Sequence, residues 1–167
     1  MDDAPVEILL ADADVLIDYR DSDLSILKLV SEHVGPVRVL REVLDEAPGI
    51  SDHRCAQLGI DIVQLETELL IEAHDLPRRL SAADRFCIIA CERHLWTLVT
   101  NDRALRAVGR QRHIRLRWGL GLMVDLVHAG VLAETRALTV AAKMQAVNPT
   151  HITADLLGRF RARLKGG

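Results

Sequence analysis

The sequence predicts an α/β fold in which a central, mainly parallel sheet is flanked by helices. Short apolar runs typical of buried strands alternate along the chain with amphipathic segments typical of helices. The run that begins at Ile8 leads into Asp12 and Asp14, and the run over residues 95–100 leads into Asp102. The carboxyl ends of parallel strands meet at one edge of a sheet, where α/β proteins bind their ligands. These carboxylates are therefore candidate site residues.

Apolar spacing and breaking residues place the elements of the first half. An acidic N-cap at residues 21–23 predicts a helix over residues 24–34, which a Gly-Pro pair ends. A second strand is expected over residues 37–40, and the helix over residues 41–47 is stopped by a Pro-Gly pair. The next elements are expected in the order helix 52–58, strand 60–65 and helix 67–74.

The second half continues this alternation and then becomes helical. Its elements are expected in the order helix 81–94, strand 95–100, helix 103–108 ended by Gly109, strand 114–118, and helices 119–129, 134–147 and 153–164. A chain of 167 residues with 49% apolar content can bury a sizeable core. We therefore expect residues 1–167 to form a single domain.

The composition argues against membrane and secreted classes. No run approaches the roughly 18 apolar residues that a membrane-spanning helix needs, and the N-terminus lacks the basic start of a secretory signal. The three cysteines are an odd number without framework spacing, which favours reduced thiols over disulfides. The sequence predicts a soluble cytoplasmic protein with no membrane partner.

Charge is distributed unevenly along the chain. Residues 1–80 contain 18 Asp and Glu against 7 Lys and Arg, whereas residues 81–167 contain 6 against 14. A metal-binding acidic cluster beside a basic, polyanion-binding surface would give this pattern, and so would two docked halves or an acidic partner. The basic half includes six arginines between Arg103 and Arg117 with no acidic residue among them. We expect this segment to bind phosphate groups of a polyanion, through Arg103, Arg106, Arg110 and Arg112, unless these charges only keep a helix face solvated.

Four short motifs occur in a fixed order on the expected elements. They are Asp-Ala-Asp-Val-Leu-Ile over residues 12–17, Glu46 (or Glu42 in a shifted register) in the helix after the second strand, Leu-Ser-Ala-Ala-Asp over residues 80–84, and Leu-Val-Thr-Asn-Asp over residues 98–102. With these motifs the chain resembles the PIN-domain family of metal-dependent ribonucleases, which includes the toxins of toxin and antitoxin pairs. The resemblance covers most of residues 6–118.

The resemblance implies a three-layer PIN-like fold, with residues 119–167 as a helical C-terminal extension. It implies that Asp12, Glu46, Asp84 and Asp102 are catalytic and bind Mg²⁺ or Mn²⁺, with Asp14, Glu42, Thr100 and Asn101 as secondary candidates. These cations prefer hard oxygen ligands, and clustered carboxylates repel one another unless a cation lies between them. The implied partners are an RNA substrate, a cognate antitoxin and a second copy of the chain.

Two positions depart from the family pattern. Asp14 stands where Asn or Ser is usual, which adds negative charge to the site. Arg106 stands four residues after Asp102, where many relatives have another Asp, and this removes a metal ligand. The number of metal ions and their affinity are therefore open at this point.

Each of these acidic residues also fits a purely structural role. Asp84 fits a capping box with Ser81, Asp102 fits a helix cap, and Glu46 fits a solvated helix position.

Two alternative functions are compatible with parts of the sequence. One is a haloacid-dehalogenase-type phosphatase with Asp12 as the nucleophile. That family also requires a later lysine and a Gly-Asp pair, whereas this chain has only three lysines and no Gly-Asp pair. The second alternative is a non-catalytic PIN-like module that only binds RNA or protein.

Overall fold

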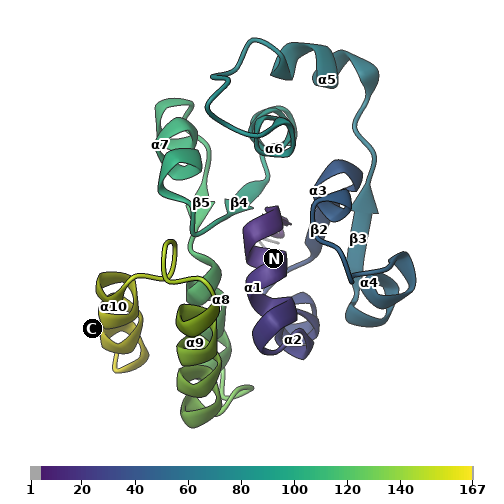
Figure 1. The fold of residues 1–167 in the computed structure, drawn as a ribbon. Coiled ribbons are helices and arrows are strands. Elements are labelled where there is room, and N and C mark those ends of the chain that lie inside the picture. The colour runs from purple at the N-terminus through teal and green to yellow at the C-terminus, as the bar shows by residue number, and fades with distance from the viewer. Residues whose placement is uncertain (1–4, 167) are drawn as a thin grey trace.

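Five short strands form one parallel sheet at the centre of the molecule (Figure 1). The structure is a computed structural model that describes residues 5–166. The strands are β1 (Leu9–Ala11), β2 (Val37–Leu40), β3 (Ile60–Val63), β4 (Thr97–Val99) and β5 (Leu116–Arg117). Their order in the sheet is β3-β2-β1-β4-β5, and every neighbouring pair is parallel. The predicted α/β fold with a mainly parallel sheet is confirmed.

The middle strand, β1, is fully buried and sets the register of its neighbours. Leu9 pairs with Val37 of β2 and with Thr97 of β4. Ala11, the last residue of β1, pairs with Val99, the last residue of β4. The two strands therefore end side by side, so the residues that follow them lie at the same edge of the sheet.

Helices cover both faces of the sheet and give the fold three layers. The helices are α1 (Ala13–Ser22), α2 (Ser25–His33), α3 (Arg41–Asp45), α4 (Asp52–Leu58), α5 (Thr67–Ala73), α6 (Ala82–His94), α7 (Arg103–Gln111), α8 (Gly119–His128), α9 (Glu134–Val147) and α10 (Ala154–Leu164). On one side α6 packs against α3, α5 and α7. On the other side α8 packs against α2, α9 and α10, while α9 also packs against α1. No helix among the described residues is long and apolar enough to cross a membrane.

The main correction to the expected elements is an additional helix, α1, which begins directly after Asp12. The apolar run continues past Asp12 through Val15 and Leu16, and such a run does not by itself distinguish a strand from a buried helix. The Asp12 side chain accepts a hydrogen bond from the Val15 amide and caps α1. Helix α1 therefore precedes the helix that was expected over residues 24–34.

Several other expected bounds also differ from the observed ones, and two of these differences have clear local reasons. Leu95 ends α6 in the left-handed conformation with φ 57°, so β4 begins only at Thr97. Helix α7 continues through Gly109 instead of ending there. A Cβ at Gly109 would lie 2.9 Å from Cδ2 of Leu116, so the missing side chain allows α7 to pack closely on β5.

The C-terminal segment docks through the apolar stripe of α10. Leu156, Leu157, Phe160 and Leu164 are buried, whereas Arg159, Arg161 and Arg163 are exposed. Figure 1 shows α8, α9 and α10 gathered below the carboxyl ends of β4 and β5. This packing brings the turn before α10 close to the start of α1.

Candidate metal centre

Asp12 lies at the end of β1 and is 1% exposed. Its Oδ1 accepts a hydrogen bond of 2.8 Å from the Val15 amide, as expected for the N-cap of α1. Burial raises the pKa of the Asp12 carboxyl well above its ordinary value, and the charges of Asp14 and Asp84 raise it further. A hydrogen bond with Thr100 opposes this change. An ionised Asp12 is therefore costly unless positive charge comes close to it.

Asp102 follows β4 and caps α7. Its Oδ1 accepts hydrogen bonds from the amides of Ala104 at 2.7 Å and Leu105 at 3.0 Å. The Asp102 amide donates to Oγ1 of Thr100 at 3.0 Å. Thr100 thus contacts both acidic residues, which follows from the register that ends β1 and β4 side by side. No described residue donates to Oδ2 of Asp102, so this oxygen remains available to a ligand.

Asp84 lies in the first turn of α6, where it completes a capping box with Ser81. The Asp84 amide donates to Oγ of Ser81 at 3.0 Å, and the Ser81 amide donates to Oδ2 of Asp84 at 3.4 Å. Burial raises the pKa of the Asp84 carboxyl, and the charges of Asp102 and Asp14 raise it further. The capping interpretation is thus correct, and the same carboxylate also faces the charges of the candidate site.

Glu46 approaches the same charges from the end of α3. Burial raises the pKa of its carboxyl, and the charges of Asp84 and Asp14 raise it further. The alternative residue, Glu42, lies one turn earlier, and its Oε2 is buried without a hydrogen-bond partner among the described residues. Of the two glutamates, Glu46 is the one whose charge is coupled to Asp84 and Asp14.

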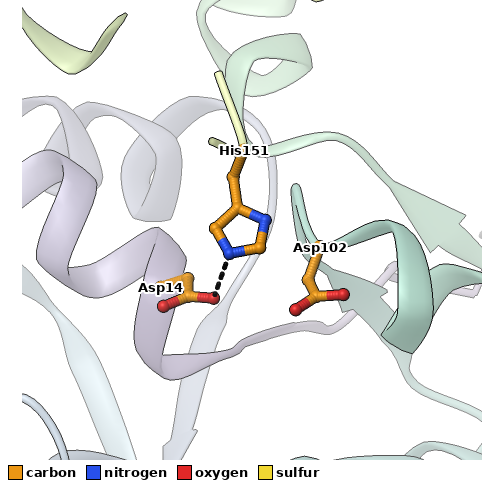
Figure 2. Close-up of side chains that lie close together, drawn as sticks. All are labelled: Asp14, Asp102 and His151. Carbon is orange, nitrogen blue, oxygen red and sulfur yellow. Dashed lines mark ion pairs between the residues drawn. The ribbon is translucent and has the colours of Figure 1, made fainter. Parts of the chain in front are cut away.

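Asp14 and Asp102 form a compact cluster with His151 (Figure 2). One potential ligand atom from each residue lies within 4.8 Å of the other two. Nε2 of His151 is 3.7 Å from Oδ2 of Asp14. Burial raises the pKa of the Asp14 carboxyl, His151 opposes this change, and Asp102 adds to it. Figure 2 shows that the three side chains come from separate segments and point toward one another.

His151 was not predicted as a site residue. It lies in the irregular segment between α9 and α10, outside the four motifs, and seven histidines occur in the chain. Only the docking of α10 brings it to the carboxylates. The expected helices 134–147 and 153–164 left this segment between them, but nothing in the sequence indicated where it would lie in space.

Four acidic residues of the site lie at the N-termini of three helices. Asp12 caps α1 and Asp14 lies in its first turn, Asp102 caps α7, and Asp84 lies in the first turn of α6. The partial positive charge at a helix N-terminus favours a nearby carboxylate. The three helix ends therefore offset part of the repulsion that the raised pKa values of Asp12 and Asp84 indicate.

The donor set suits a divalent cation. The compact cluster supplies carboxylate oxygens from Asp14 and Asp102 and one imidazole nitrogen from His151. The carboxylates that act on it through their charges, Asp12, Glu46 and Asp84, have pKa values raised by burial and by nearby negative charge. A cation that binds between such groups relieves both burial and repulsion costs. Exposure increases from the buried Asp12 through the half-buried Asp84 and Asp102 to the exposed Glu46. The cluster therefore has a side that faces solvent.

The Asn101 side chain forms two buried hydrogen bonds that the sequence did not predict. Its Nδ2 donates to Oδ2 of the buried Asp18 at 3.3 Å, and its Oδ1 accepts from the Gly119 amide at 2.9 Å. The buried Asn101 side chain therefore links α1 to the start of α8. A Cβ at Gly119 would lie 2.8 Å from Nδ2 of Asn101, so this close approach requires glycine.

Arg106 differs from its expected place on an exposed RNA-binding surface. It is 5% exposed, and its guanidinium lies 3.7 Å above the centre of the Trp118 ring. Its Nη1 donates to the Thr100 carbonyl at 3.1 Å, while its Nε is buried without a partner among the described residues. Burial lowers the pKa of Arg106 to about 10, and the nearby charge of Arg110 contributes. Arg106 remains charged at neutral pH at a cost to stability.

The other arginines of this segment divide into two groups. Arg103 and Arg110 line a cavity together with Arg106. Arg112 instead forms an ion pair of 2.8 Å with Glu92, and Arg117 pairs with Glu7 and Asp125. The expected phosphate-binding role of Arg112 is therefore not supported by its position.

The comparisons with known proteins agree with this architecture. A family model described as a PIN domain matches residues 8–165. The fold is similar to that of a PilT N-terminus domain protein from the hyperthermophilic archaeon Sulfolobus solfataricus, with a TM-score of 0.52 and 11% sequence identity. That likeness covers 76% of this chain and 95% of the other, and at this identity it concerns the fold alone. No curated protein matches the sequence.

Proposed function

Because the chain belongs to the PIN-domain family, we propose that it is a metal-dependent endoribonuclease that cleaves phosphodiester bonds of RNA. PIN domains are commonly nucleases. The observation that carries the proposal is the compact cluster of Asp14, Asp102 and His151. The carboxylates of Asp12, Asp84 and Glu46 are close enough for the charges of Asp14 and its neighbours to raise their pKa values. The helix N-termini offset only part of the repulsion within this cluster, and a bound cation would relieve the rest.

We assign Asp12, Asp102, Asp14 and His151 as the residues that would hold the metal, with Asp84 and Glu46 beside them. A bound Mg²⁺ or Mn²⁺ would lower the pKa of a coordinated water and neutralise charge on the reacting phosphate. Thr100 orients two of these residues, since its hydroxyl contacts Asp12 and accepts from the Asp102 amide. The pKa values of Asp84 and Glu46 are raised, which favours their protonated forms and suits carboxylates that accept and return a proton.

The phosphatase alternative has little support in this geometry. A covalent nucleophile needs an accessible oxygen, whereas Asp12 is 1% exposed and is hydrogen-bonded by Val15 and Thr100. The non-catalytic alternative predicts a cluster that binds a ligand without cleavage. Replacement of a family acid by Arg106 is the observation that favours it.

The biological setting remains part of the proposal. We propose that the protein acts as the toxin of a toxin and antitoxin pair, or as a close relative of one, with RNA as its substrate. A cognate antitoxin and a second copy of the chain are its proposed partners. This part rests on the resemblance of the motifs to those toxins.

Cleavage of single-stranded RNA by the full-length chain tests the activity. We expect cleavage with Mg²⁺ or Mn²⁺, no cleavage with EDTA, and a loss of about a hundredfold or more in Asp102→Asn, which keeps the shape and the cap. Asp75→Asn is the matched control, since Asp75 is exposed and lies outside both the acidic cluster and the arginine-lined cavity. Wild-type cleavage by Asp102→Asn would overturn the assignment, and metal binding without cleavage would favour the non-catalytic alternative.

A further inference from the structure

A cavity of about 370 Å³ lies between α7 and the C-terminal segment. Arg103, Arg106 and Arg110 line it from α7, and Arg159 lines it from α10. Asp155 is the one carboxylate among the lining residues. Cavities that bind small molecules have volumes of about 300–1,000 Å³. The cavity is therefore large enough for a group of nucleotide size, and its lining attracts anions.

The arginines of this cavity are largely without protein partners. Arg159 pairs with Asp155 at 3.1 Å, but both side chains are well exposed, so this ion pair is weak. Among residues 5–166, Arg103, Arg106 and Arg110 form no ion pair with a carboxylate. Three neighbouring arginines on one helix repel one another unless an anion binds between them.

Arg106 supplies the buried, fixed part of the cavity. Stacking on Trp118 and the hydrogen bond from Nη1 to Thr100 hold its guanidinium in place. Its Nε is buried without a partner among the described residues, although a buried charged donor without an acceptor is costly. Arginine is well suited to phosphate because its planar donors match two phosphate oxygens at once. An anion in the cavity would offset the cost of burying this charge.

The cavity adjoins the carboxylate cluster. His151 lines the cavity and also belongs to the cluster with Asp14 and Asp102. Arg103 follows Asp102 directly in the chain. An apolar cavity of about 80 Å³ lies on the other side and shares Trp118, Leu156 and Arg159 with the first. The acidic cluster, the arginine-lined cavity and the apolar cavity thus adjoin one another in that order.

We propose that this cavity is a phosphate subsite, which binds the phosphate of a nucleotide next to the bond that is cleaved. The proposal rests on the proposed nuclease function and adds a second recognition site to it. The phosphate can be a terminal phosphomonoester or an internal phosphodiester, since both present oxygens that arginines bind. The apolar side cavity then contacts the sugar or base of the same nucleotide. Because His151 and α10 complete the cavity, the C-terminal segment contributes to substrate recognition.

Binding of small nucleotides to the full-length chain tests the subsite. Trp96→Phe leaves Trp118, in the cavity wall, as the single tryptophan whose fluorescence reports binding. The probes are uridine 5′-monophosphate, the dinucleotide UpU, and uridine, with EDTA present so that no metal contributes. We expect at least one phosphate-containing probe to change the fluorescence and raise the Tm, while uridine does neither. Comparison of the two probes distinguishes a terminal from an internal phosphate.

Two sets of variants identify the residues. Arg106→Met keeps apolar volume and removes the charge, and we expect it to weaken binding about tenfold or more. If this variant does not fold, the double variant Arg103→Gln and Arg110→Gln changes two exposed positions and is expected to weaken binding similarly. Arg161→Gln is the matched control, since Arg161 is exposed on α10 and does not line the cavity.

The outcomes separate this proposal from the nuclease assignment. Wild-type affinity in the arginine variants, or equal binding of uridine and its monophosphate, would overturn the subsite. Tighter binding of hexaglutamate than of UpU would also overturn it, because the cavity would then serve an acidic protein segment. Neither nucleotide binding nor its loss requires cleavage. Intact binding without RNA cleavage would therefore overturn the nuclease proposal alone, and cleavage without nucleotide binding would overturn the subsite alone.

Discussion

Nε2 of His151 lies 3.7 Å from Oδ2 of Asp14, although the two residues come from opposite ends of the chain (Figure 2). Asp14 is in the first turn of α1, and His151 is in the segment that precedes α10. With Asp102 they bring two carboxylates and an imidazole into one cluster. The C-terminal segment therefore completes the candidate metal centre, and we expect changes in this segment to alter metal binding.

The imidazole of His151 should shift the preference among metal ions. Carboxylate sites accept Mg²⁺ and Mn²⁺, whereas a nitrogen ligand favours transition metals over Mg²⁺. We expect His151→Ala to weaken Mn²⁺ binding about tenfold or more and to affect Mg²⁺ binding less. Calorimetric titration with each metal measures the difference. His74→Ala, at an exposed position of the first half, is the control. Equal losses for both metals would contradict the expected preference, and unchanged Mn²⁺ affinity in His151→Ala would show that His151 does not bind the ion.

Neutralising Asp12 should stabilise the metal-free protein in a pH-dependent way. Burial raises the pKa of Asp12 in the folded state, so folded Asp12 holds a proton that the unfolded chain has already lost. Stability from this group is therefore present at acidic pH and is lost as the pH rises through the raised pKa. We expect Asp12→Asn to have little effect near pH 4 and to raise the free energy of unfolding at pH 7 by about 1 kcal/mol or more.

Urea unfolding of the wild type and Asp12→Asn in EDTA, at several pH values, measures this dependence. Added Mg²⁺ should raise the Tm of the wild type more than that of Asp12→Asn, because the ion binds the Asp12 carboxylate, which the variant lacks. Asp155→Asn serves as the exposed control. A stability difference that does not grow with pH would show that Asp12 is not an uncompensated charge in the folded protein.

Asn101 should prove more important for stability than its position beside Asp102 suggests. Its amide bonds Asp18 on α1 and the Gly119 amide at the start of α8. Asn101→Ala would leave the Gly119 amide unpaired and Asp18 with Asn148 as its remaining side-chain partner. We expect a loss of about 1–3 kcal/mol in the free energy of unfolding. Asn148→Ala, which removes a single bond to Asp18, should cost less; an equal or smaller loss for Asn101→Ala would contradict this account.

Removal of the C-terminal segment should expose apolar surface as well as open the site. A chain that ends at Val147 loses α10, whose Leu156, Leu157, Phe160 and Leu164 are buried. Fully burying such a side chain contributes roughly 1.5–3 kcal/mol. We expect the truncated chain to lose several kcal/mol of stability or to aggregate, as measured by thermal unfolding and light scattering. Unchanged mass and stability would show that α10 does not pack as described.

The sequence by itself determined the α/β alternation and the position of the acidic residues on it. Strand ends, caps and turns depend on interactions between residues a few positions apart, so they can be read locally. Asp12 after β1, Asp84 in its capping box and Asp102 at the start of α7 all lie where their motifs indicated. The parallel register then placed Asp12 and Thr100 together, because β1 and β4 end side by side.

Only the tertiary structure decided which further residues join them. His151 reaches Asp14 because the stripe of α10 docks on α8 and α9, and no local pattern specifies where that docking ends. Arg106 is buried because Trp118, which precedes α8, covers it, although its sequence neighbours predicted an exposed basic face. The first contact joins opposite ends of the chain, whereas the second joins α7 to the residue before α8. Their geometry follows from how whole helices pack against the sheet, which local propensity and spacing do not encode.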